Sequence, residues 1–337
     1  MLYVVIIYLW MALLLYLLLG GADFGAGIIE LFTSDKNKDK TSNTLYRAIG
    51  PVWEANHMWL IIVIVILFTG FPEIYSTVST YLHIPLAIML LGIIARGTAF
   101  AFRHYDAVQD EMQKVYNKIF RYSSFITPLF LGIIAGSAVD GRIDPKAGSF
   151  AGAFLFSWLS FFSVSVGLFT VSICGYLAAI FIIGEARTEA GRKRYIVKAR
   201  SMNLAAVFAG SLVFIAATRS NIPLASWLFG NPVGLCAILA ALLSLIVQWW
   251  LISRGKIIII RALAGFQIAM ILLATTYYHY PRIILMKGGA YLSLLEHRGD
   301  DKSITALALA LLAGSLFILP ALLYLIYSFQ KKKPVGI

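Results

Sequence analysis

Long apolar stretches separated by short polar connections dominate the chain. Crossing about 30 Å of hydrocarbon takes roughly 20 apolar residues in a helix, and stretches of this kind recur nine times. They lie near residues 3–32, 50–71, 78–103, 119–138, 150–184, 202–218, 232–253, 258–280 and 304–329. The pattern therefore predicts an all-α integral membrane protein with nine transmembrane helices.

The connections between these spans are short, and none is long enough to fold as a separate soluble domain. We therefore expect a single membrane domain over residues 1–337. Four spans precede the polar break DGRIDPKAG at residues 140–148, four follow it, and one comes last. This spacing indicates a first four-helix bundle at 1–140, a second at 149–281 and an additional ninth helix at 303–330.

Composition supports membrane insertion, and the distribution of basic residues predicts the orientation. Hydrophobic residues make up 60% of the chain and charged residues 13%, whereas soluble domains are about a quarter charged. Most of the 28 Lys and Arg residues lie in the connections after the odd-numbered spans and in the C-terminal tail. By the positive-inside rule the N-terminus is outside and the C-terminus is cytoplasmic. The net charge of +12 then indicates contact with anionic lipid and not with nucleic acid.

Four of the ionisable residues inside or near the ends of the predicted spans form a candidate site. Glu54 and His57 open the second span and are neighbours on one helical face, because they are three residues apart. Asp23 lies near the cytoplasmic end of the first span, and Arg96 lies seven residues before Arg103 in the third. The predicted orientation puts all four at a similar depth on the cytoplasmic side. Intramembrane ionisable groups are costly and often mark proton or substrate paths.

A structural interpretation exists for each of these residues. Glu54 can be a first-turn carboxylate that stabilises the dipole of a helix beginning at Pro51. Asp23 can be a charge partner of Arg96 and nothing more, and Arg96 can instead extend to the membrane interface. His57 can be a packed histidine, since no second residue has the spacing of a metal or haem ligand.

Four motifs together resemble those of subunit II of the cytochrome bd type quinol oxidases. They are GADFGAG at residues 21–27, PVWEANHMWLI at 51–61, FPEIYS at 71–76 and ARGTAFAFR at 95–103. That family commonly has DGFDLGVG-like and P-W-[DE]-x-N-x-x-W-L patterns in this order. The resemblance covers the whole chain, although its specific motifs lie in the first third. The chain departs from the first motif, in which Asp23 is the only acidic residue that remains.

The resemblance implies a heterodimeric enzyme of the bacterial or archaeal cytoplasmic membrane that oxidises quinol and reduces O2 to water. In that family the haems b558, b595 and d are ligated by subunit I, so none is expected on this chain. The implied partners are the haem-bearing subunit I, an optional small accessory subunit, quinol, O2 and membrane lipid. The surface for subunit I is expected on the second, third and ninth spans.

The resemblance also implies roles for the four ionisable residues. Glu54 matches the acidic position of the second motif, which is associated with proton uptake from the cytoplasm. Asp23 matches the aspartate of the first motif, and Arg96 matches the arginine of the third span. We therefore predict a proton path through Glu54, Asp23 and His57, with charge compensation by Arg96 and no catalytic, cofactor-binding or metal-binding residue on this chain. His57 matches a variable position, so its role stays open.

Other classes of function remain compatible with the residues. A secondary transporter or proton-coupled channel built from inverted four-helix repeats would also carry ionic side chains in its spans. The polar residues are expected near one membrane surface and not at the midplane, which favours a half-channel over alternating access. A further alternative is a purely structural subunit whose partner performs all the chemistry.

Overall fold

The computed structural model describes residues 1–49, 53–105, 112–186, 188–254 and 256–331. It describes the backbone alone at residues 35, 36, 39, 47–49, 53–55, 104, 105, 253, 322, 323 and 325–331.

Long helices follow the predicted spans. The first span consists of α1 (Leu2–Leu15), a π-helical turn η1 (Tyr16–Gly20) and α2 (Gly21–Leu31). The other long helices are α4 (Trp53–Gly70), α6 (His83–Tyr105), α7 (Met112–Val139), α9 (Phe161–Ile183), α10 (Glu189–Arg219), α12 (Pro232–Ser253), α13 (Ile257–Tyr277) and α14 (Asp301–Lys331). Shorter helices are α3 (Asp35–Ile49), α5 (Pro72–Tyr81), α8 (Phe150–Phe154) and α11 (Leu224–Phe229).

The number of spans depends on how a bent helix pair is counted. Within the described residues, eight helices are long and apolar enough to cross a membrane. A ninth span results if α4 and α5, which are bent by 116° relative to each other, count as one. The prediction of an all-α membrane protein is therefore confirmed.

Helix starts follow local sequence signals. Ser160, Thr188 and Asn231 each precede a helix and accept a hydrogen bond from the backbone N–H three residues later, as N-cap residues do. Ser149 does the same for α8. The prediction of one continuous helix over 150–184 is therefore wrong at its beginning, because two N-caps divide this segment into α8 and α9.

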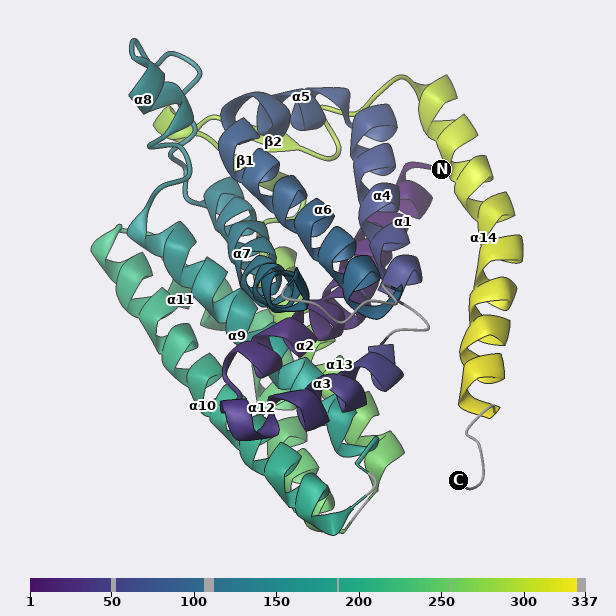
Figure 1. Cartoon of the computed structure of the whole chain (residues 1–337). Helices are drawn as coiled ribbons and strands as arrows, with labels where there is room; N and C mark the ends of the chain where they lie inside the picture. The colour runs from purple at the N-terminus through teal and green to yellow at the C-terminus, as the bar shows by residue number, and fades with distance from the viewer. Residues whose placement is uncertain (50–52, 106–111, 187, 255, 332–337) are drawn as a thin grey trace.

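Figure 1 shows how the helices are arranged in space. Helix α9 packs against α2, α7 and α10, while α6 packs against α7 and α12 against α13. Helix α14 stands at one side of the molecule and packs chiefly against α1 and α4 (Figure 1). Segments far apart in the sequence therefore surround α2.

Glycines allow α2 to lie very close to two of its neighbours. A Cβ atom added to Gly25 would lie 1.9 Å from the carbonyl oxygen of Cys174 in α9. A Cβ atom added to Gly27 would lie 2.2 Å from the Oγ atom of Ser124 in α7. Small residues at such spacing let helix backbones approach within a membrane. This close packing removes Asp23 of α2 from both water and lipid.

A small β-hairpin that the sequence patterns did not predict lies at the end of the molecule that also holds α5 and α8 (Figure 1). Strands β1 (Arg282–Leu285) and β2 (Tyr291–Ser293) are antiparallel and joined through a short turn, η2 (Lys287–Gly289). Lys287 ties this turn to the 140–148 connection, because its backbone N–H donates to the Ile143 carbonyl and its Nζ lies 2.9 Å from Asp144.

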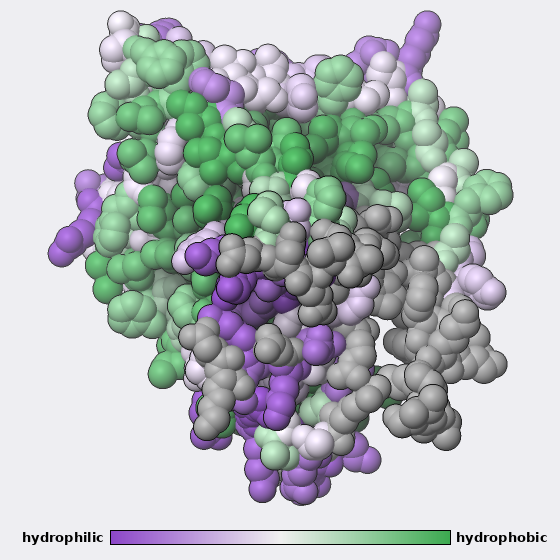
Figure 2. All heavy atoms as spheres, viewed as in Figure 1, coloured by the Kyte–Doolittle hydropathy of each residue, from purple (hydrophilic) through white to green (hydrophobic). Residues whose placement is uncertain are grey.

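The surface in this view fits a membrane protein. Figure 2 shows hydrophobic residues in a broad band, with hydrophilic residues at the upper rim and gathered in the lower part. Which end faces the cytoplasm stays a prediction, as does the division into two four-helix bundles.

Candidate functional site

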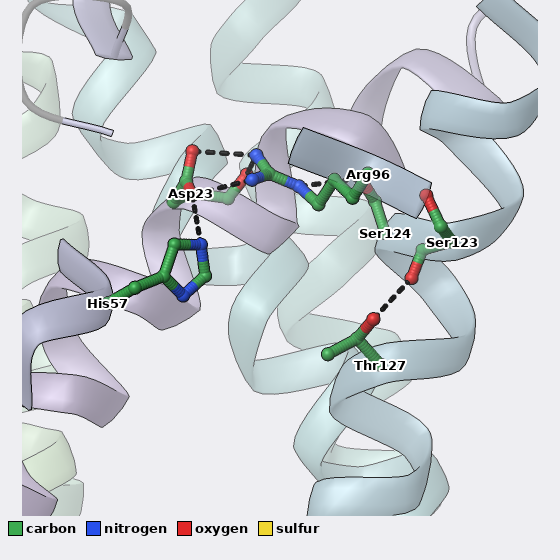
Figure 3. A network of polar contacts seen from close by, with 6 residues as sticks. All are labelled: Asp23, His57, Arg96, Ser123, Ser124 and Thr127. Carbon is green, nitrogen blue, oxygen red and sulfur yellow. Dashed lines mark hydrogen bonds and ion pairs between the residues drawn. The ribbon is translucent and has the colours of Figure 1, made fainter. Parts of the chain in front are cut away.

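A buried ion pair between α2 and α6 forms the centre of the candidate site (Figure 3). The exposed fraction of Asp23 is 0% and that of Arg96 is 1%. The Nη1 atom of Arg96 donates to Oδ2 of Asp23 at 2.7 Å, and Nη2 donates to Oδ1 at 2.6 Å. Nη2 also donates to the backbone carbonyl of Asp23 at 3.0 Å. The two charges therefore neutralise each other through a two-pronged contact, the strong form of an Arg–carboxylate pair.

The remaining surroundings of Arg96 hold its guanidinium group in place. Its Nε atom donates to Oγ of Ser124 in α7 at 3.0 Å. The aromatic rings of Phe24 and Phe120 lie 5.2 and 5.0 Å from its Cζ atom, within the range of cation–π attraction. The interpretation in which Arg96 extends to the membrane interface is therefore wrong, because the guanidinium is buried and its hydrogen bonds point into the protein.

His57 lies beside this pair, at the edge of α4 (Figure 3). Its Nε2 atom is 3.8 Å from Oδ2 of Asp23, which is longer than a direct hydrogen bond. The imidazole ring packs near the rings of Phe24 and Tyr16, at centroid distances of 5.7 and 6.3 Å. The structure thus brings Asp23, Arg96 and His57 together, as their expected depth suggested.

The side chain of Glu54 lies outside the described residues. The backbone places Glu54 in the first turn of α4, one turn before His57. No contact of the Glu54 carboxylate with the Asp23–Arg96 pair is therefore assigned.

The turn η1 and two hydroxyl residues of α7 shape the neighbourhood of the pair. The π-helical turn ends at Gly20, three residues before Asp23, and such turns are frequent at functional sites. On α7, Oγ1 of Thr127 donates to the carbonyl of Ser123 (Figure 3). This back-bonding keeps the Thr127 hydroxyl within its own helix, so Ser124 is the α7 hydroxyl that contacts Arg96.

A second ion pair on the same two helices was missed by the sequence reasoning. Nη2 of Arg103 lies 3.0 and 3.1 Å from the carboxylate oxygens of Glu30. Glu30 follows Asp23 by seven residues, and Arg103 follows Arg96 by seven. Seven residues make two helical turns, so this repeated spacing is the signal that predicts a parallel second pair.

The described residues contain no cluster of side chains of the kind that binds a metal ion. Among them, no three His, Cys, Asp or Glu side chains cluster so that they could hold a metal ion. His57 faces a carboxylate that is already engaged by Arg96. No chemical step of this chain is therefore assigned to a cofactor of its own.

Comparison with known proteins identifies the family. The model of the family described as cytochrome bd terminal oxidase subunit II matches residues 1–329. The chain belongs to this family. The resemblance seen in the four motifs is thereby confirmed, and the transporter interpretation finds no support. Together with the long apolar helices, family membership makes this subunit II chain a multi-pass protein of the bacterial cytoplasmic membrane.

Individual relatives of this subunit II chain cover it in part. It is 28% identical to the cytochrome bd ubiquinol oxidase subunit 2 of Bacillus subtilis (strain 168) over 216 residues, which are 62% of this chain and 61% of the relative. It is 24% identical to the cytochrome bd-I ubiquinol oxidase subunit 2 of Escherichia coli (strain K12) over 144 residues, which are 41% and 37% of the two chains. The match to the Bacillus relative thus spans about three fifths of that protein.

A solved structure resembles nearly the whole fold. The bd oxidase from Geobacillus thermodenitrificans contains a chain that matches 98% of this subunit II chain, and the match covers 100% of that chain. The TM-score is 0.78 at 22% sequence identity. The arrangement of helices described above is therefore that of a solved bd oxidase chain.

Proposed function

We propose that this chain is the second subunit of a membrane-bound quinol:O2 oxidoreductase and pairs with a haem-bearing subunit I. Family membership over residues 1–329 supports this, as do the names of the relatives, which are ubiquinol oxidase subunits. In this proposal the haems b558, b595 and d are bound by subunit I, where quinol is oxidised and O2 is reduced to water. A small accessory subunit is compatible with it.

The proposed contribution of this chain is structural support and proton uptake from the cytoplasm. Reducing one O2 to two water molecules consumes four protons, so protons taken from the cytoplasmic side generate a gradient without pumping. The proposal of proton uptake rests on the buried Asp23–Arg96 pair, with the His57 imidazole 3.8 Å from the Asp23 carboxylate. Buried ionic groups of this kind within membrane helices often belong to proton relays.

The members of the site have different roles in this proposal. Asp23 is held in place by three hydrogen bonds from Arg96 and lies on the path beside His57. His57 is the group that accepts and releases a proton, because a neutral imidazole can do both and its Nε2 atom lies 3.8 Å from Oδ2 of Asp23. Glu54, one turn closer to the start of α4, is the proposed carboxyl group that receives protons from water.

The experiment that tests this proposal replaces Glu54 in the assembled complex. Glu54→Gln removes the titratable group and should slow quinol oxidation by about 100-fold per haem, the low end of the effect of a proton-transferring residue. Glu54→Asp keeps a carboxyl group and should retain more activity. Glu73→Gln, at the exposed start of α5, is the matched control and should leave turnover unchanged.

Haem content and subunit stoichiometry are measured on the same samples. If Glu54 only stabilises the helix dipole, Glu54→Gln costs about 0.3–1 kcal/mol of stability and turnover stays normal. A fully active Glu54→Gln complex would remove this residue from the path.

A further inference from the structure

The Glu30–Arg103 pair is a second buried carboxylate site that the proposed path has not used. The exposed fraction of the Glu30 side chain is 5% and that of Arg103 is 9%. Glu30 lies one residue before the end of α2, and Arg103 lies two residues before the end of α6. Two helical turns separate this pair from Asp23 and Arg96, a rise of roughly 10 Å. It is therefore nearer to the helix ends than the first pair, on the side predicted to be cytoplasmic.

Glu30 is held more loosely than Asp23. Only the Nη2 atom of Arg103 donates to Glu30 among the described contacts, and this same atom also donates to Oγ of Ser42 in α3. One guanidinium nitrogen carries two hydrogens, so three acceptor oxygens compete for them. In the first pair, Nη1 and Nη2 of Arg96 each face their own carboxylate oxygen. A proton can thus displace a contact at Glu30 more easily than at Asp23.

A small cavity connects the two pairs. Its lining includes both carboxylates and both guanidinium groups, and it is completed by Ala26, Ser42, Leu45, Tyr46, Phe100 and Phe120. The space has room for roughly one water molecule. Most of the surface that faces this space is apolar, and the residues of the two ion pairs are among those that line it. The two carboxylates are therefore linked through a space that a water can occupy.

The charged groups around Glu30 come from three neighbouring helices. Arg103 of α6, Arg121 of α7 and Lys38 of α3 all act on the carboxylate electrostatically. Asp23 on the same helical segment is compensated by Arg96. When a proton binds Glu30, the carboxyl group no longer offsets the charge of these cations, which favours passage of the proton onward.

We propose that Glu30 is a second carboxyl group, besides Glu54, through which protons enter the path from the cytoplasmic side, with Arg103 and Ser42 as the groups that hold it. A proton from outside water binds one Glu30 oxygen as a hydrogen bond from Arg103 breaks. The carboxyl group then gives the proton to a water in the cavity and returns to Arg103. The proton then passes by way of Asp23, whose Oδ2 atom lies 3.8 Å from Nε2 of His57, to the imidazole, so Glu30 ends the cycle unchanged. This inference rests on the proposed function and adds a second point of proton uptake to it.

The test uses the complete complex and measures turnover per haem. Glu30→Gln keeps the size of the side chain and removes its titration, and should lower turnover at least about tenfold. Glu30→Asp should restore a large part of it. A purely structural role would not change the solvent isotope effect, whereas slowed proton uptake should raise the ratio of turnover in H2O to that in D2O. Glu73→Gln again serves as the matched control.

A second variant keeps the test decisive if Glu30→Gln prevents assembly of the complex. If Glu30→Gln alone does not assemble because Arg103 is left uncompensated, Glu30→Gln/Arg103→Gln removes both charges and should restore the complex while turnover stays slow. Native turnover in either assembled variant overturns the proposal. If neither variant assembles, the pair is a structural tie between α2 and α6, and the proposal also fails.

The outcomes separate this inference from the proposed function. Slow turnover in Glu54→Gln with native turnover in Glu30→Gln would reject Glu30 alone and leave the path through Glu54 intact. A complex that carries no haem or does not oxidise quinol would reject the proposed function, whatever Glu30 does.

Discussion

Burial of the Arg96 guanidinium group costs free energy, yet its charge is needed to compensate that of Asp23. A guanidinium group with an exposed fraction of 1% has lost its hydration, and this loss is offset only if its hydrogen bonds are satisfied. Asp23 accepts three of them and Ser124 accepts a fourth. Phe24 and Phe120 flank the charge. The pair is therefore stable as a unit, and either member alone is an uncompensated charge.

The first prediction at this scale concerns Arg96→Ala. Removal of the arginine leaves Asp23 unpaired in a buried site, which should cost about 3–5 kcal/mol of folding free energy. Adding Asp23→Asn should recover part of this loss, because no charge then remains buried. Thermal unfolding of the purified complex measures both variants. Lys193→Ala, at a side chain that is 78% exposed and paired with the similarly exposed Glu189, is the control and should cost about 1 kcal/mol or less. Additive losses in the double variant would show that Asp23 and Arg96 are not partners.

The sequence could predict the first ion pair but not its whole neighbourhood. Span boundaries and the positive-inside rule put Asp23, His57 and Arg96 at one depth, and depth together with opposite charge is enough to suggest contact. Glu30 and Arg103 lie near helix ends, where charged residues are common for many reasons, so only their seven-residue spacing from the first pair distinguishes them. The π-helical turn at Tyr16–Gly20 follows from packing between helices and has no signature in an apolar run.

Elements between the spans were harder to predict than the spans themselves. The runs of apolar residues fixed the existence of the long helices because hydrocarbon leaves a backbone few alternatives. Strands β1 and β2 have four and three residues, too few for an alternating pattern to emerge. After the bend at Gly70, Phe71 is the N-cap residue of α5 and Pro72 is its first residue. A proline is common in the first turn of a helix, but here it did not show from the sequence whether the span continues or a new helix begins.

A pH-dependent prediction belongs to the hairpin element. The hydrogen bond from Lys287, followed by that from the backbone N–H of Lys146, lowers the pKa of Asp144 below its usual value. A lowered pKa in the folded state means that the ionised form stabilises the hairpin. This stabilisation is present above the unfolded pKa of Asp144 and is lost as the pH falls through the lower, folded pKa. Hydrogen exchange at the Lys287 amide, which donates to Ile143, should therefore show less protection in acid.

The matched variants for this prediction are both aspartate replacements. Asp144→Asn should reduce protection of the Lys287 amide at neutral pH and remove most of its acid dependence. Asp300→Asn changes another aspartate with a lowered pKa, one whose hydrogen bonds are with Ser303 and Lys302 at the start of α14, and should leave the hairpin unchanged. Equal protection in the wild type and Asp144→Asn at every pH would show that the Lys287 contact does not hold the turn.

At the scale of the whole molecule, α14 stands at one side of the other long helices (Figure 1). It packs chiefly on α1 and α4, and Tyr8 of α1 donates a hydrogen bond to Ser315 of α14 at 2.9 Å. Several of its large apolar side chains are exposed, including Leu316 and Phe317 with exposed fractions of 74% and 78%. Such a face is compatible with lipid or with a partner subunit, and the family resemblance implies the partner for the second, third and ninth spans.

The last prediction distinguishes these two environments by crosslinking in the assembled complex. In a chain that carries Cys236→Ser and keeps the buried Cys174, Leu316→Cys on α14 should crosslink to the haem-bearing subunit through a short cysteine-to-lysine or photoactivated reagent. Phe208→Cys on α10 is the matched control, because Phe208 is 73% exposed and lies on a helix that is not among the expected partner spans. A face covered by a protein excludes lipid probes as well, so a lipid-soluble thiol reagent should label Phe208→Cys faster than Leu316→Cys. Crosslinks from Phe208→Cys with none from Leu316→Cys would move the partner surface to the α10 side of the molecule and leave α14 facing lipid.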